Sequence, residues 1–136
     1  MPLVIDASVS LNWALQEQNP LAETARERLQ SDDALVPALW WFEVRNGLVV
    51  NERRKRISQE GSALFLDELA RFPIAIDYSS DEIAVMALAR RHRLTVYDAA
   101  YLELALRESL PLATLDAALA EAARREGVRV IGDAAA

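Results

Sequence analysis

Short apolar runs alternate with longer helical segments along the whole chain, and this alternation constrains the fold more than any other feature. Continuously apolar runs of this length are typical of parallel strands, because such strands are buried on both faces. The longer segments have the spacing of amphipathic helices. We therefore predict an α/β fold with a mainly parallel sheet and helices on both faces. The predicted strands are 2–6, 34–36, 73–77, 94–98, 111–116 and a last short strand at 128–132.

The predicted helices follow start signals in the sequence. "SSDEIAVMALARRH" (79–92) opens with serine and acidic residues, which favour a helix N-terminus. Pro37 is expected near the first turn of a helix that runs to about Arg56. No repeat, linker or composition break interrupts this order, so the 136 residues are expected to form a single domain, 1–136. The other predicted helices are 8–17, 20–31, 58–72 and the segments after 98 and 116.

The composition fits a globular protein, with 52% hydrophobic and 26% charged residues. No apolar run approaches the roughly 18 residues that a membrane span needs. The N-terminus, "MPLVIDAS", lacks the basic region and long apolar stretch of a signal peptide. We therefore expect a soluble, cytoplasmic protein with no membrane segment.

Several kinds of chemistry are excluded by residue usage. The chain has no cysteine, which rules out disulfides, zinc–thiolate sites and thiol catalysis. Lys55 is the single candidate for a catalytic lysine. The formal charge of −6 argues against nucleic-acid binding over the whole surface. It leaves open a local basic patch, or a site where metal ions supply the positive charge.

Three predicted strands end in the same way. "VIDAS", "VYDAA" and "TLDAA" each run from apolar residues to aspartate, then alanine, then a helix. Asp6, Asp98 and Asp116 therefore fall at the carboxyl ends of three predicted strands. In open α/β sheets, ligands bind in the crevice outside those ends.

Helix capping is the alternative explanation of these aspartates. Aspartate is among the best N-cap residues and complements the helix dipole, so capping suffices for each position taken alone. Three carboxylates at one edge of a sheet, however, raise one another's pKa and oppose ionisation. Bound divalent cations would remove that penalty, so the sequence leaves both interpretations open.

A fourth candidate carboxylate, Glu43, lies in "ALWWFEVRNGL", the most apolar helical segment of the chain. Asn46 and Gly47 follow at i+3 and i+4 and share its helix face. Gly47 would let another segment approach closely. Glu43 therefore either belongs to the solvated face of an amphipathic helix or points into a lined pocket.

Four carboxylates without soft ligands favour a hard cation such as Mg²⁺ or Mn²⁺. Mg²⁺ usually keeps several waters and takes one or two carboxylates per ion, so four acidic residues could serve one ion or two. The chemistry of such a site is phosphoryl transfer or hydrolysis, because a metal lowers the pKa of bound water and stabilises charge on the leaving oxygen.

The chain resembles the PIN-domain ribonucleases, and most closely the VapC-type toxins of bacterial and archaeal toxin–antitoxin pairs. The resemblance rests on "VIDASV", on the glutamate in "WWFEVRNGL" and on "TVYDAAYLELALRESLPLATLDAALAEAA". It spans nearly the whole chain, and the segment 95–123 is its most specific part.

The resemblance implies a three-layer α/β/α sandwich whose acidic residues bind Mg²⁺ or Mn²⁺ and direct water onto an RNA phosphodiester. It also implies a homodimer and a small antitoxin partner that covers or perturbs the site. Four residues of this sequence match the acidic, metal-binding positions of the family. Two more match its hydroxyl positions, and the resemblance implies that they orient carboxylates or waters. The implied catalytic set is Asp6, Ser8, Glu43, Asp98, Thr114 and Asp116, of which the four acidic residues hold metal.

Other chemistry-bearing residues have simpler explanations. His92, the only histidine, precedes the predicted strand at 94–98 and so falls at the amino end of the sheet, away from the carboxylates. The basic cluster 89–93 is expected to be solvated near a helix C-terminus. For the cluster 51–56 both a solvated role and contact with RNA phosphates stay open. Its candidate RNA contacts are Arg53, Arg54 and Arg56.

The tryptophans Trp13, Trp40 and Trp41 could stack on bases. Neighbouring residues cannot face one direction on a helix, however. At least one of Trp40 and Trp41 is therefore expected to fill the core or an interface.

Three further classes of protein compete with a nuclease. A receiver-like signalling module also gathers acidic residues at strand ends, but it would carry a lysine near the end of a late strand, whereas Lys55 lies in a predicted mid-chain helix. A phosphatase of the haloacid dehalogenase type would have Asp-x-Asp after its first strand, and Ser8 occupies the second position. A non-catalytic interaction module, in which the aspartates only cap helices, also stays open.

Overall fold

The central layer is a parallel sheet. The computed structural model describes residues 1–134, and in this part of the chain four strands form one sheet in the order β3-β2-β1-β4. All three strand pairs are parallel, which confirms the predicted α/β fold. The strands are β1 (Leu3–Ile5), β2 (Ala34–Pro37), β3 (Ile74–Asp77) and β4 (Leu112–Ala113).

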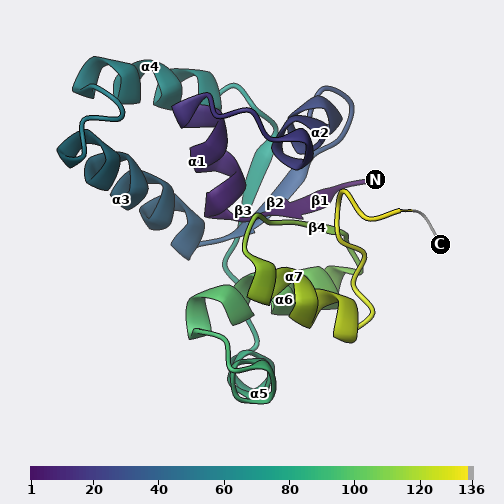
Figure 1. Cartoon of the computed structure of the whole chain (residues 1–136). Helices are drawn as coiled ribbons and strands as arrows, with labels where there is room; N and C mark the ends of the chain where they lie inside the picture. Colours follow the sequence, from purple (N-terminus) through teal and green to yellow (C-terminus); the bar gives the residue numbers. More distant parts are fainter. Residues whose placement is uncertain (135–136) are drawn as a thin grey trace.

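Helices cover both faces of this sheet, as Figure 1 shows. One side carries α1 (Ala7–Leu15), α2 (Pro20–Arg28), α3 (Leu39–Arg53) and α4 (Gln59–Leu69). The other side carries α5 (Glu82–His92), α6 (Val96–Glu108) and α7 (Ala117–Arg125). This is the expected three-layer α/β/α arrangement.

The core lies where β1 and α6 meet. β1 pairs with β2 on one side and β4 on the other, so its three residues are inaccessible to solvent. α6 packs against β1, β2 and β4, and its small buried residues Ala99 and Ala105 let the helix lie close to the sheet. β1 ends and α6 begins beside the same edge of the sheet. These two elements therefore fix the positions of Asp6, which follows β1, and of Asp98, in the first turn of α6.

The strand predicted at 94–98 is wrong, because this segment is the start of α6. Thr95 is the N-cap, and its hydroxyl accepts the backbone N–H of Asp98 at 3.0 Å. Asp98 lies in the first helical turn rather than at a strand end. A short apolar run does not by itself separate a strand from a buried helix, and here capping and the burial of the alanine-rich helix decide.

The remaining differences are at element boundaries. The predicted strand at 128–132 is reduced to an isolated parallel bridge between Leu112 and Val130. Pro37 ends β2 instead of opening the next helix, which begins at Leu39 and ends at Arg53 rather than Arg56. These shifts leave the order of strands and helices unchanged.

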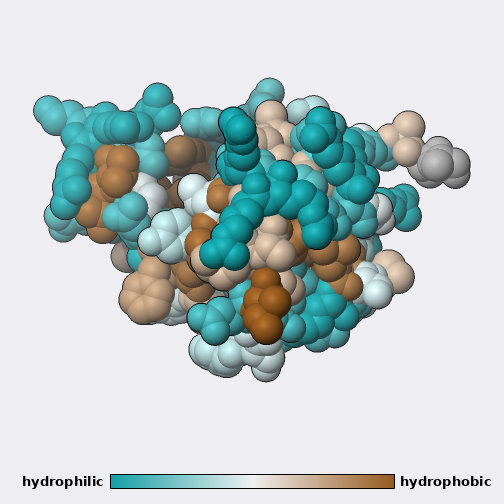
Figure 2. All heavy atoms as spheres, turned by 90° about the horizontal axis from the view of Figure 1, so that it is seen from below, coloured by the Kyte–Doolittle hydropathy of each residue, from teal (hydrophilic) through white to brown (hydrophobic). Residues whose placement is uncertain are grey.

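The surface combines hydrophilic and hydrophobic areas. Figure 2 shows the molecule from below, from the side where α5 lies in Figure 1, and hydrophobic residues are scattered among hydrophilic ones on this face. The starts of α5 and α6 contribute exposed apolar residues, including Ile83, Val96 and Tyr97. Among residues 1–134, no helix is long and apolar enough to cross a membrane.

We predict that Thr95→Ala lowers the free energy of unfolding by about 1 kcal/mol, because α6 loses its side-chain cap. Thr95→Ser, which keeps the hydroxyl, should restore most of that stability. Urea denaturation followed by circular dichroism measures both.

Thr24→Ala is the matched control, since the hydroxyl of Thr24 only donates to the carbonyl of Pro20 within its own helix. Alanine is the better helix former, so this variant should be as stable as wild type or slightly more stable. Equal losses at positions 95 and 24 would contradict the capping role.

Candidate functional site

An acidic cleft of about 380 Å³ opens at the carboxyl edge of the sheet. Asp6 follows β1 and Asp116 follows β4, and these two strands are neighbours. Glu43 enters from the second turn of α3 and Asp98 from the first turn of α6. The structure therefore brings all four predicted carboxylates to the wall of one cleft.

Asp6 is the most buried of these carboxylates, with 4% of its surface exposed. Its Oδ1 accepts the hydroxyl of Ser8 at 2.5 Å and the backbone N–H of Val9 at 3.2 Å. Its Oδ2 accepts the hydroxyl of Thr114. Burial raises the pKa of Asp6 to about 6, although these hydrogen bonds lower it. Donors on both oxygens thus hold the carboxylate in one orientation.

The two hydroxyls that hold Asp6 are themselves fixed by the backbone. Ser8 Oγ accepts the N–H of Leu115 at 2.9 Å, and Thr114 Oγ1 accepts the N–H of Asp116 at 3.0 Å. Because each hydroxyl accepts one of these N–H groups, its own proton is free to be donated to Asp6. The β4–α7 turn is thereby tied to the start of α1. This contact fits the orienting role predicted for Ser8 and Thr114, which stays a prediction.

Asp98 and Asp116 are more exposed than Asp6. Asp116 caps α7, since its Oδ1 accepts the N–H of Leu119 at 2.9 Å. The pKa of Asp98 is raised, first by burial and then by the negative charges of Asp116 and Glu43. Among the residues described, no lysine, arginine or histidine lines the cleft to offset this repulsion.

Glu43 lines the cleft, which is one of the two orientations that the sequence left open. Asn46, Gly47 and Val50 line the cleft with it, so the face predicted for α3 is confirmed. A Cβ atom on Gly47 would lie 2.3 Å from Cδ1 of Leu11, which explains why glycine lets α1 approach α3 closely here.

One polar residue of the cleft, Tyr101, is not among the predicted site residues. Its hydroxyl donates to Oε1 of Glu43 at 2.6 Å. Burial and the Glu43 charge raise the pKa of Tyr101 far above its usual value, so the hydroxyl stays protonated. The sequence contains one signal for it: Tyr101 follows Asp98 at i+3 and so shares its helix face.

The donor set of the cleft consists of carboxylate oxygens, which suit a hard cation. Within residues 1–134, no three Asp, Glu or His side chains are grouped tightly enough to hold one ion by themselves. An octahedral Mg²⁺ needs only one or two carboxylates, because waters complete its coordination. The four carboxylates fit that kind of site, shared between protein and water.

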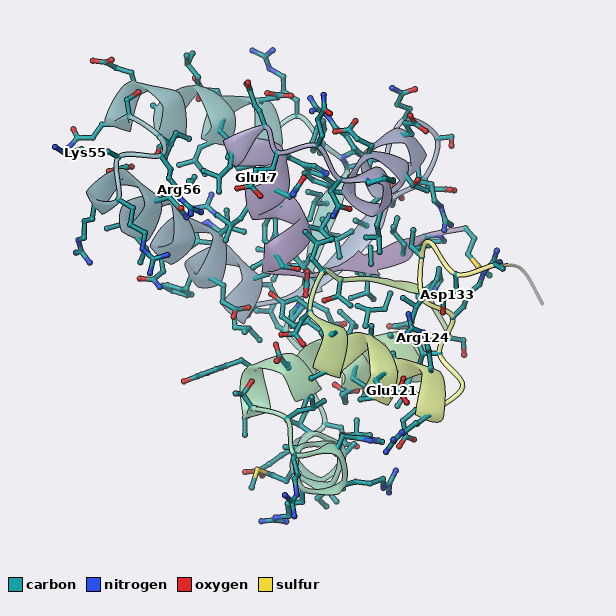
Figure 3. The ribbon with its side chains drawn as sticks, viewed as in Figure 1. Glu17, Lys55, Arg56, Glu121, Arg124 and Asp133 are labelled. Carbon is teal, nitrogen blue, oxygen red and sulfur yellow. The ribbon has the colours of Figure 1, made fainter. Side chains whose placement is uncertain are left out.

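The other candidate residues lie elsewhere. His92 ends α5, and its Nε2 lies 2.6 Å from Oε2 of Glu126, outside the cleft. His92 lies apart from the carboxylates, as predicted, although the strand predicted after it at 94–98 is the start of α6. Lys55 and Arg56 lie at the far end of α3, where the chain turns into α4 (Figure 3).

The tryptophans are divided between core and surface. Trp13 and Trp40 are each 5% exposed, and Trp40 donates to Ser10 Oγ at 3.0 Å. Trp41 is 44% exposed and stacks with Arg45. The prediction that at least one of the neighbouring pair fills the core is confirmed.

The fold and the cleft together define an α/β protein with a carboxylate site at the carboxyl edge of its sheet. The PIN domain family matches residues 3–125, so the chain belongs to the PIN domain family. A curated relative, Ribonuclease VapC3 of Pyrobaculum aerophilum, is 37% identical over 125 residues. That match covers 89% of this chain and 94% of the relative.

Solved structures share the fold at lower identity. PAE2754 from Pyrobaculum aerophilum is 24% identical with a TM-score of 0.70, and the match covers 96% of this chain and 84% of the other. FitAcB from Neisseria gonorrhoeae is 20% identical with a TM-score of 0.60, covering 97% of both chains. A toxin–antitoxin complex from Klebsiella pneumoniae is 18% identical with a TM-score of 0.58, covering 84% of this chain and 86% of the other.

We predict that Asp6 makes the metal-free protein more stable as pH falls from about 7 to about 4. The pKa of Asp6 is about 6 in the folded state and near 3.8 unfolded, so the folded state binds more protons in this window. The gain should be on the order of 2 kcal/mol. It is measured as the difference between wild type and Asp6→Asn in denaturation with EDTA present.

Asp133→Asn is the control of opposite sign. Arg124 lowers the pKa of Asp133, so the stability that this pair contributes is lost, not gained, as pH falls through the folded-state pKa. A difference between wild type and Asp6→Asn that does not vary with pH would contradict the buried, ionised carboxylate.

Proposed function

We propose that the chain is a divalent-metal-dependent endoribonuclease and the toxin of a toxin–antitoxin pair. The observation that carries the proposal is the convergence of Asp6, Glu43, Asp98 and Asp116 on one cleft of a PIN domain. The similarity to Ribonuclease VapC3 supports RNA as the substrate. The PIN domain is proposed to be the single domain of the chain, 1–136.

The proposed cofactor is Mg²⁺ or Mn²⁺, held by the four carboxylates. When bound, the cation would supply a water of lowered pKa and stabilise charge on the leaving oxygen. The chain's own part is to hold the carboxylates in fixed orientations. Ser8 and Thr114 direct hydrogen bonds to Asp6, and Tyr101 directs one to Glu43. The backbone partners of Ser8 and Thr114 and the buried ring of Tyr101 keep these donors in place before substrate binds.

Proposed partners follow from the same family. The Klebsiella pneumoniae relative is described as a toxin–antitoxin complex, which supports a small antitoxin protein as partner of this chain. A homodimer is proposed as well. Exposed apolar residues on the helices that carry Glu43 and Asp98, including Phe42 and Val96, offer surface for protein contacts.

A non-catalytic module whose aspartates only cap helices explains less of the site. Asp6 and Asp116 do cap α1 and α7. Asp98, however, is not a cap, because Thr95 caps α6. Glu43 lies in the second turn of α3 and caps nothing. A receiver-like module is also disfavoured, since Lys55 lies at the far end of α3.

We predict that purified protein cleaves RNA with Mg²⁺ or Mn²⁺ and that EDTA abolishes cleavage. Asp98→Asn should lower the rate at least a hundredfold without unfolding the protein, since Asp98 makes no cap. Products should carry 5′-phosphate and 3′-hydroxyl ends, because water is the nucleophile. Gel assays with end analysis test this, and 2′,3′-cyclic phosphates would overturn the mechanism by implicating the RNA's own 2′-hydroxyl.

Asp116→Asn in the same assay separates capping from chemistry. Asparagine caps nearly as well as aspartate, so α7 should stay intact while cleavage falls sharply. Asp81→Asn is the matched control, because Asp81 caps α5 through the N–H of Ala84 at 3.1 Å and does not line the cleft. Equal activity in the two variants would remove Asp116 from the site.

We also propose that the basic cluster at the end of α3 contacts RNA phosphates. Val50 lines the cleft and Arg53 lies three residues further along the same helix, so a strand leaving the cleft could follow α3. Replacing Arg53, Arg54 and Arg56 with alanine should reduce the salt dependence of single-stranded RNA binding by up to about 2 in log–log slope.

Fluorescence anisotropy in EDTA measures this slope without cleavage. Arg90→Ala with Arg93→Ala is the control, because these exposed arginines lie at the C-terminus of α5, on the opposite side of the sheet from α3. Equal changes in slope for the two sets would mean that neither cluster is a specific contact.

A further inference from the structure

We propose that Tyr101 is a positioning residue for Glu43, holding one carboxylate oxygen so that the other stays directed at a bound cation. The inference rests on the proposed metal-dependent function. It concerns a hydrogen bond between two side chains that are 58 residues apart in sequence.

The contact joins elements from opposite sides of the sheet. Glu43 comes from α3, which packs against α1, and Tyr101 comes from α6, which packs against the sheet, α5 and α7. Tyr101 is 1% exposed, so its ring is fixed by the core while its hydroxyl reaches the cleft. A rigid donor is thereby presented to a half-buried carboxylate on another helix.

Glu43 needs such a partner because its surroundings repel it. Asp98 and Asp116 carry charge of the same sign in the same cleft, and their repulsion would drive a flexible glutamate towards solvent. Holding the side chain inward also costs rotamer freedom. The hydrogen bond from Tyr101 opposes both effects at Oε1.

The chemical identity of the donor matters for a cation site. A lysine or arginine at this position would attract Glu43 more strongly, but it would also neutralise the carboxylate and repel a metal ion. A phenol donates a hydrogen bond and leaves the negative charge in place. Oε2 accepts no hydrogen bond from another residue in the described chain, so it remains available to a cation or its water.

Outer partners of this kind strongly affect metal sites. Removing a hydrogen bond to a ligand typically costs 10- to 100-fold in metal affinity or activity. Tyr101→Phe deletes the hydroxyl and keeps the ring. The expected result is Mn²⁺ binding weakened roughly 10-fold or more, measured by isothermal titration calorimetry on metal-free protein. The kcat for RNA cleavage should fall, whereas KM should change little, because Tyr101 is too buried to contact RNA.

Tyr97→Phe is the matched control. It removes the same atom from the same helix, but Tyr97 is 62% exposed and does not line the cleft. Mn²⁺ affinity and kcat should equal those of wild type. Circular dichroism and melting temperature report whether each variant folds.

A double-mutant cycle tests whether Tyr101 acts through Glu43. In a Glu43→Ala background, which removes the acceptor of the hydrogen bond, Tyr101→Phe should cause no further loss of Mn²⁺ affinity. An undiminished loss in that background would overturn the inference. So would a Tyr101→Phe protein that melts lower but binds Mn²⁺ as tightly as wild type, since that result means a purely structural role.

The outcomes also separate this inference from the proposed function. A wild-type protein that binds Mn²⁺ but cuts no RNA would overturn the ribonuclease proposal, while the Mn²⁺ affinities would still decide the role of Tyr101. A wild-type protein that binds no Mn²⁺ would overturn the positioning role itself.

Discussion

The buried carboxylate of Asp6 is the constraint on which the rest of the site depends. A charged group with 4% exposure is unfavourable unless donors surround it, and here donors reach both oxygens. One of them, Thr114, lies 108 residues away in sequence. The full set of donors is therefore assembled only after β4 has paired with β1, so the site depends on this long-range strand pairing.

The remaining carboxylates add repulsion that no basic side chain of the described cleft lining relieves. Burial and neighbouring charges raise the pKa of Asp98, and the described cleft lining contains no basic side chain. The cation–anion pairs of the described residues lie outside the cleft, such as that of Arg107 with Asp77 and Glu103. The cleft thus stores unfavourable electrostatic energy that a bound cation would release, as expected of a site selected for binding rather than for stability.

The four carboxylates of the cleft are predictable from the sequence, but the strand predicted to carry Asp98 is a helix. Strands such as "PLVID" and "PIAID" were identifiable because buried parallel strands are short and continuously apolar. "LTVYD" has the same pattern but begins α6, since Thr95 caps a helix there. Asp98 still lines the cleft, because the first turn of α6 lies at the carboxyl edge of the sheet, where a strand end would also have placed it. Tyr101 could not be paired with Glu43 from sequence, because that requires knowing that α3 and α6 meet across the cleft.

Capping and chemistry are not competing explanations of these aspartates. α1, α6 and α7 all begin at the cleft, so three helix N-termini direct partial positive charge at it. That partial charge opposes the repulsion among Asp6, Asp98 and Asp116 in a cleft whose described lining has no lysine or arginine. The N–H groups of Val9 and Leu119 are already occupied by the carboxylates, so they are not available to bind a phosphate as helix N-termini often do. The carboxylates of this cleft would therefore repel an RNA phosphate, and a divalent cation bound between them would offset that repulsion.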